Sequence, residues 1–100
     1  MNVRELNDAL CALMPGLNRE HSVDRVIYGD PGSDIKGVAV CWLPSISAIR
    51  DAASFGANLV VTHEPTFYDH FEFRNSAPCS RLDEAISVKK ALLDELGMAV

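Results

Sequence analysis

Residues 45–65 read SISAIRDAASFGANLVVTHEP, a segment that predicts a helix followed by a short buried strand. Ser45 is a favourable N-cap, apolar residues recur at helical spacing through 45–55, and Gly56 suits a left-handed C-terminal cap. The run at 59–62 is too short for a helix and is apolar on both faces, which favours a strand covered by helices on both sides. A helix between two such strands makes a right-handed crossover, so the strands that it joins should be parallel.

Upstream, the sequence predicts one more helix and two more strands. Asn2 and Glu5 form a capping-box pattern before an amphipathic run, which predicts a helix at 3–14. Two apolar runs rich in β-branched residues flank a turn of glycine, aspartate and proline, and we expect strands at 23–28 and 35–41.

Downstream, Ser80 and Asp83 give another cap signal, and the helical stripe at 81–96 ends at Gly97. Residues 98–100 then begin what should be another parallel strand. The sequence stops in this apolar stretch without a polar tail, so we expect a chain truncated after the start of a strand.

The alternation of strands and helices predicts an α/β fold, a layered sheet with parallel βαβ crossovers flanked by helices. The length of 100 residues suits a single domain, and no internal repeat or linker divides residues 1–100.

Composition excludes several classes of function. Nine basic and fourteen acidic residues leave a net charge of -5, which disfavours nucleic acid as a partner. No signal-peptide pattern or apolar run of about 18 residues is present, which disfavours export and membrane insertion. Cys11, Cys41 and Cys79 are odd in number and widely spaced, so we expect reduced thiols in a cytoplasmic protein, with Cys41 buried in its strand.

His63 and Glu64 are the best candidates for chemistry, because they directly follow the predicted strand at 59–62. In open α/β sheets, ligands gather outside the carboxyl ends of parallel strands. An imidazole nitrogen and a carboxylate suit zinc, iron or manganese. Pro65 excludes a helix through the pair, so this is not a helical metalloprotease motif. The alternative is a solvated pair that makes ordinary hydrogen bonds.

Residues 45–68, and above all FGANLVVTHEPTF at 55–67, resemble the NGG-interacting-factor-three-like family, also called GTP cyclohydrolase I type 2 homologues. That family has a helix, Gly-Ala-Asp-Leu or similar, a buried strand and then His-His-Pro. Upstream, Gly29-Asp30 and the strand at 35–41 match the family's Gly-Asp turn and the strand that follows it.

The resemblance implies the N-terminal part of a longer dinuclear metal-centre protein. His63 matches the first of two adjacent histidine ligands of two divalent metal ions, and Glu64 stands where the second histidine usually is. The carboxylate makes the site harder, favouring manganese, magnesium or iron over softer metals such as zinc. The remaining ligands would lie beyond Val100. The family also implies a homo-oligomer, a toroidal hexamer.

Two functions are compatible with such a site. The first is a metal-dependent hydrolase for a nucleotide-like or phosphoester substrate, in which His63 and Glu64 are ligands and the metal ions activate a water molecule. The sequence contains no P-loop to support a nucleotide further. The second is a non-catalytic metal-binding or regulatory protein that acts through oligomeric assembly and protein partners.

Other candidates have structural explanations. His70 lies in an aromatic cluster, and we favour packing of a long loop over an extra ligand or a substrate-stacking lid; the cluster comprises Phe67, Tyr68, Phe71 and Phe73. We assign a surface position to His21, a turn to Asp30, a core or interface anchor to Trp42, and a solvated helix face to Lys89 and Lys90.

Overall fold

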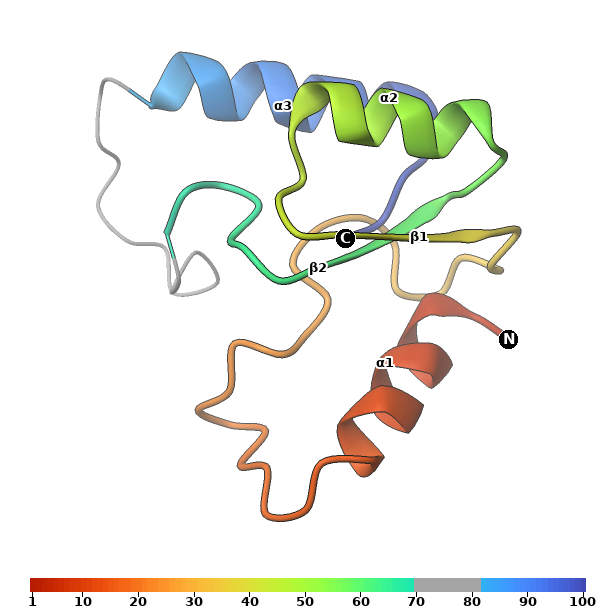
Figure 1. Cartoon of the computed structure of the whole chain (residues 1–100), viewed down its shortest axis with the longest axis vertical. Coiled ribbons are helices and arrows are strands. Elements are labelled where there is room, and N and C mark those ends of the chain that lie inside the picture. The colour runs from red at the N-terminus through yellow and green to blue at the C-terminus, as the bar shows by residue number, and fades with distance from the viewer. Residues whose placement is uncertain (70–81) are drawn as a thin grey trace.

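The computed structural model of the chain describes residues 1–69 and 82–100. Two strands and three helices form in this part of the chain, with both termini close to the sheet (Figure 1). In chain order they are α1 (Val3–Ala12), β1 (Val38–Cys41), α2 (Ile46–Ser54), β2 (Leu59–Thr62) and α3 (Asp83–Leu96).

The two strands are parallel, with Val38 beside Leu59 and Cys41 beside Thr62. Helix α2 connects them, which confirms the strand orientation expected from the sequence. Ala99 extends the pairing on the other side of β2 through a parallel bridge to Leu59. The Val60 N–H donates to the Ala99 carbonyl over 2.9 Å, so the chain does run parallel to β2 again at 98–100.

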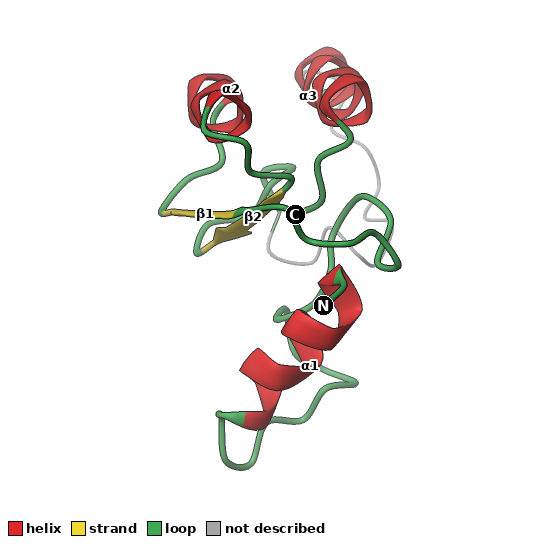
Figure 2. Cartoon of the chain, turned by 90° about the vertical axis from the view of Figure 1, so that its right-hand side faces the viewer, coloured by secondary structure: helices red, strands yellow, loops and turns green. Residues whose placement is uncertain are grey.

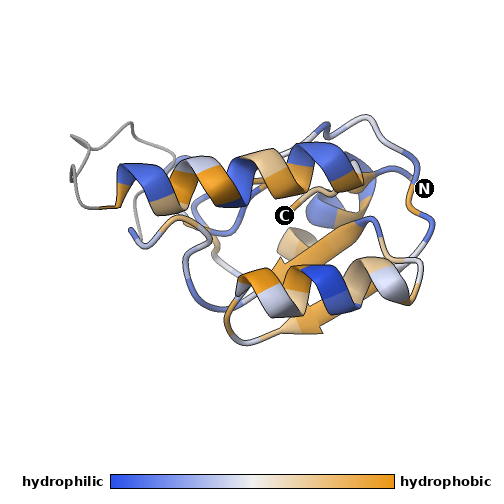
Figure 3. Ribbon diagram, turned by 90° about the horizontal axis from the view of Figure 1, so that it is seen from above, coloured by the Kyte–Doolittle hydropathy of each residue, from blue (hydrophilic) through white to orange (hydrophobic). Residues whose placement is uncertain are grey.

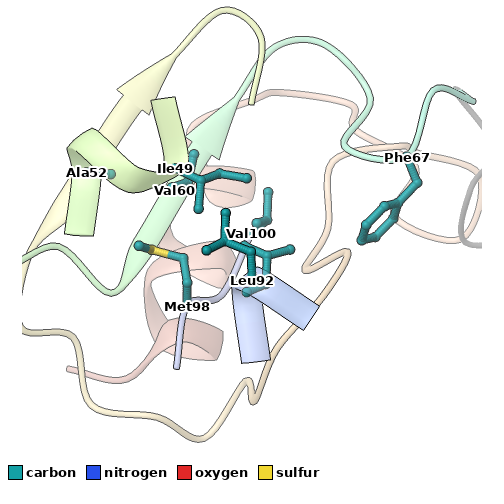
Figure 4. Close-up of a cluster of buried hydrophobic side chains, with 8 residues drawn as sticks. Ile49, Ala52, Val60, Phe67, Leu92, Met98 and Val100 are labelled. Atoms are coloured by element: carbon teal, nitrogen blue, oxygen red, sulfur yellow. The ribbon is translucent and has the colours of Figure 1, made fainter. Parts of the chain in front are cut away.

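Helices α2 and α3 lie on one face of the strands and α1 lies on the other (Figure 2). Seen from above, both upper helices mix hydrophilic and hydrophobic residues, while the strands beneath them are hydrophobic (Figure 3). Alternate residues of β2 serve the two faces, because Val60 packs under α2 and α3 while Leu59 packs with Val3 of α1. The main core cluster gathers between the upper helices and the sheet (Figure 4) and comprises Ile49, Ala52, Val60, Phe67, Leu92, Leu93, Met98 and Val100.

The helix ends follow the capping signals in part. The Asn2 and Glu5 capping box is formed at the start of α1, and the Ser45 side chain accepts from the Ala48 N–H at the start of α2. Gly97 ends α3 in the left-handed conformation. Helix α3 begins after Leu82 without a side-chain cap, and the predicted cap Ser80 lies outside the described residues.

No strand forms at 23–28, so this prediction was wrong. The Ile27 and Tyr28 N–H groups both donate to the Val100 carbonyl, and the Val100 N–H donates to the Tyr28 carbonyl. Hydrogen bonds to the single residue Val100 do not form a β-ladder. The preceding residues curl into a loop, because the Arg25 guanidinium donates to the Arg19 and Ser22 carbonyls.

The strand predicted at 35–41 is confirmed in its second half, since β1 begins at Val38. Before it, the Ile35 N–H donates to the Met1 carbonyl, and Asp34 forms an antiparallel bridge with Asn2. These backbone bonds tie residues 34–35 to the start of the chain, while the Asp34 carbonyl accepts from the Asn58 side chain and Ile35 packs against the cluster that contains Leu59. Across residues 1–69 and 82–100, none of the helices is long and apolar enough to cross a membrane.

Candidate functional site

His63 and Glu64 lie directly after the carboxyl end of β2, where the sequence places them. The His63 N–H donates to the Cys41 carbonyl over 3.3 Å, and the Glu64 N–H donates to the Trp42 carbonyl over 2.8 Å. Both residues therefore continue the pairing with the neighbouring chain beyond the end of the regular strands. This fixes the backbone from which the two side chains project.

The two side chains meet. The Nδ1 atom of His63 lies 3.2 Å from Oε1 of Glu64, and the side chains are 63% and 35% exposed. The Trp42 indole stacks on the His63 imidazole with ring centroids 3.8 Å apart and planes 9° from parallel. Trp42 is 67% exposed, so it is no core anchor; it contacts a candidate ligand instead.

Thr62 adds a contact that the sequence analysis missed. Its hydroxyl Oγ1 lies 3.1 Å from the Trp42 carbonyl oxygen and 3.2 Å from the Glu64 carbonyl oxygen. The hydroxyl has one proton, so it donates to either of these carbonyls or is shared between them. A small β-branched hydroxyl residue at the last position of a strand is the signal that could have indicated it.

The donor set of the pair fits part of a metal site. Two ligands that each lie about 2.1 Å from one ion are separated by roughly 3 Å, and 3.2 Å between the nitrogen and the oxygen agrees with this. The same distance is that of an ordinary hydrogen bond. Among residues 1–69 and 82–100, no group of three or more His, Cys, Asp or Glu side chains is arranged to hold an ion. The described part of the chain thus offers two donors.

A cleft of about 280 Å³ opens beside the pair, between α1, the loop at 23–27 and the end of β2. His63 and Glu64 belong to its lining, together with Arg25. The other walls are mainly apolar and include Val3, Leu6, Leu10, Met14, Val26 and Val61. Asn7 and Asp24 also line it. A mainly apolar cleft with a few polar groups is the usual form of a small-molecule site.

The loop after Glu64 is held against α3. Lys89 is 1% exposed, so its assignment to a solvated helix face was wrong, whereas Lys90 is exposed as predicted. The Lys89 Nζ donates to the Thr66 carbonyl over 2.8 Å. Phe67 is buried, and its ring meets the Tyr28 ring edge to face at 5.5 Å.

Packing therefore accounts for Phe67 in the aromatic cluster, while His70, Phe71 and Phe73 lie outside the described residues.

The remaining residues singled out in the sequence have simple surroundings. His21 is exposed, and the Asp30 carboxylate accepts from the Gly32 N–H, which makes Asp30 a turn residue. Cys11 and Cys41 are free thiols; Cys11 is buried and Cys41 partly buried, and Cys79 lies outside the described residues.

Comparison of the chain with models of protein families, with curated proteins and with solved structures found no match.

Proposed function

We propose that the chain supplies His63 and Glu64 to the metal site of a dinuclear metal-centre protein, a metal-dependent hydrolase for a nucleotide-like or phosphoester substrate. The observation that carries this proposal is the pair itself, a nitrogen and a carboxylate oxygen 3.2 Å apart at the carboxyl end of a parallel strand. The resemblance of residues 45–68 to the NGG-interacting-factor-three-like family is the second support.

Divalent ions at such a site lower the pKa of a bound water and stabilise charge that develops on a phosphoryl group. The chain's own residues have simpler roles. His63 and Glu64 bind the metal ions, and Trp42 orients the His63 imidazole by stacking on it. Glu64 brings a negative charge that favours manganese, magnesium or iron over zinc. The other ligands come from water or from groups outside the described residues.

The adjoining cleft supports a small-molecule substrate. Its polar lining at His63 and Glu64 would face the phosphoester group, and its apolar walls along α1 would accept an apolar portion such as a nucleobase. A cleft of about 280 Å³ has room for a group of that size.

One observation favours the second candidate, a non-catalytic metal-binding or regulatory protein that acts through assembly. Val40 of β1 and the adjacent Trp42 are 79% and 67% exposed. Large apolar side chains on an open strand are typical of an interaction surface. We further propose that β1, β2 and residues 98–100 belong to a larger layered sheet with parallel crossovers in a cytoplasmic protein.

The test uses the full-length protein, purified without chelators, incubated separately with manganese, iron and zinc, and then dialysed. Elemental analysis should find stoichiometric metal. The loaded protein is then assayed on a panel of phosphoesters and nucleotides with and without added metal. Turnover that requires metal supports the hydrolase, and bound metal without turnover supports the non-catalytic candidate. Failure to retain stoichiometric metal contradicts both.

A further inference from the structure

The side chain of Lys89, including its charged ammonium group, is buried. It lies on α3 among buried neighbours and is itself 1% exposed. Its Nζ donates to the Thr66 carbonyl over 2.8 Å and lies 4.4 Å from the centroid of the Tyr68 ring. A carbonyl on one side and an aromatic face on the other thus receive the ammonium.

Burial of an ammonium is unfavourable unless hydrogen bonds or an opposite charge compensate it. Within the described residues the ion pairs are Arg19 with Asp8 and His63 with Glu64, and neither includes Lys89. An apolar side chain of similar length would fill the same space without this cost. A lysine at this position therefore contributes a specific polar contact to the loop that it touches.

That loop has an unusual backbone. Tyr68 has φ of +71°, a left-handed conformation that is rare for a bulky residue and that persists only when its surroundings hold it. Lys89 contacts the residues on either side of Phe67, and the Lys90 ammonium lies 5.1 Å from the Phe67 ring centroid. Two consecutive lysines thus contact the loop, in addition to the buried cluster that Phe67 shares with Leu92 and Leu93 of α3.

The anchored carbonyl is close to the candidate ligand in sequence. Thr66 follows Glu64 by two residues, and Pro65 between them has a fixed φ that leaves little slack. On its other side, Glu64 is held by its N–H bond to the Trp42 carbonyl and by the Thr62 hydroxyl at its own carbonyl. Movement of Thr66 would therefore be transmitted to Glu64.

We infer that Lys89 is a positioning residue for Glu64, which fixes the loop at 65–68 on α3 and thereby the orientation of the carboxylate. The effect on metal binding rests on the proposed function. The anchoring of the loop does not, and it has a readout of its own.

The test compares Lys89→Met with Lys36→Met, at an exposed lysine before β1 and away from this loop, in the full-length protein. We expect Lys89→Met to speed amide hydrogen exchange at Glu64 and Phe67 by about tenfold or more, with exchange in β1 and α2 unchanged. Loss of a supporting contact lowers metal affinity by roughly 10–100-fold, so Mn²⁺ should bind about tenfold more weakly. Lys36→Met should change neither quantity.

The possible results are distinct. Unchanged exchange at Glu64 in Lys89→Met overturns the inference, whether or not the wild type binds Mn²⁺. Faster exchange throughout the sheet and helices also overturns it, since this would mark a purely structural role. A wild type that binds no Mn²⁺ contradicts the proposed function, while the exchange data still decide the role of Lys89.

If Lys89→Met does not fold, Lys89→Arg is compared with Lys36→Arg instead. Arginine keeps the cation but presents its donors in a planar fork. Lys89→Arg should therefore shift exchange at Glu64 in the same direction, and exchange like that of the wild type would count against the inference.

Discussion

The imidazole of His63 has a defined orientation before any ligand is considered. One face lies on Trp42 and its Nδ1 faces Glu64, although the side chain is more than half exposed. Stacking on Trp42 and the contact with Glu64 limit the rotation of the ring. His63 can thus bind a metal ion with a smaller loss of side-chain entropy than an unrestrained surface histidine.

His63→Ala should lower the metal content of the full-length protein by about tenfold or more, because one of two described donors is lost. The free energy of unfolding should change by less than about 1 kcal/mol, since substitutions of exposed side chains have small effects. Elemental analysis and urea unfolding measure the two quantities. His21→Ala, at another exposed histidine, is the control and should retain its metal. Equal metal in both variants would remove His63 from the site.

Glu64→His should be tolerated and should shift the preference toward zinc, because it replaces a hard carboxylate oxygen with a softer nitrogen. Competition of zinc against manganese, followed by elemental analysis, gives the ratio of bound ions. Glu20→His creates a histidine on the exposed loop and serves as the control. An unchanged ratio in Glu64→His would mean that Glu64 does not contact the ion.

At the scale of elements, the turn at Gly29 packs very closely against residues 98–100. Gly29 has φ of +90°, and a Cβ there would lie 2.7 Å from the Ala99 Cα. Gly29→Ala should therefore lower the free energy of unfolding by about 2–3 kcal/mol, through backbone strain and overpacking. Gly16 has φ of +78° and open space around it, so Gly16→Ala should cost only about 1 kcal/mol. Urea unfolding of both variants is the measurement, and equal losses would contradict the close approach.

The sequence predicted helices well because their signals are local. The capping residues Asn2 and Ser45 and the terminal Gly97 act within one helical turn of themselves. The predicted end of α1 was two residues too late, since Leu13 and Met14 are exposed and gain no burial from continuing the helix. The strand end that carries His63 and Glu64 was predicted for the same local reason.

The failures concern contacts between distant segments. Whether residues 23–28 form a strand depends on their partner, and that partner is the backbone of Val100. Helical spacing placed Lys89 on a polar face, yet Thr66, 23 residues earlier, covers it. The stacking of Trp42 on His63 likewise requires the register between the ends of β1 and β2. Periodicity contains no information on any of these pairings.

At the scale of the whole molecule, the two edges of the sheet differ in whether their backbone is paired. At residues 98–100, Ala99 pairs with residues 58 and 60, and Val100 pairs with residues 27 and 28. In the described residues, β1 pairs with β2 alone, so the open edge is β1.

Helices α2 and α3 cover one face of the sheet, and on the opposite side α1 packs at Leu59 and Ala99. Val38, Val40 and Trp42 are left exposed along β1. An open strand that presents large apolar side chains is suited to pairing with a second copy of the same strand about a twofold axis.

We predict that the chain self-associates through β1, so that Val40→Lys shifts it toward the monomer. A lysine at an edge strand opposes pairing through charge and desolvation, and a loss of about 1.4 kcal/mol per interface already weakens association tenfold. Light scattering over a concentration series measures the mass of wild type and variant. Val88→Lys, at an exposed valine on α3, is the control and should associate as the wild type does. If the wild type stays monomeric across the series, or if both lysine variants weaken it equally, β1 is not the interface.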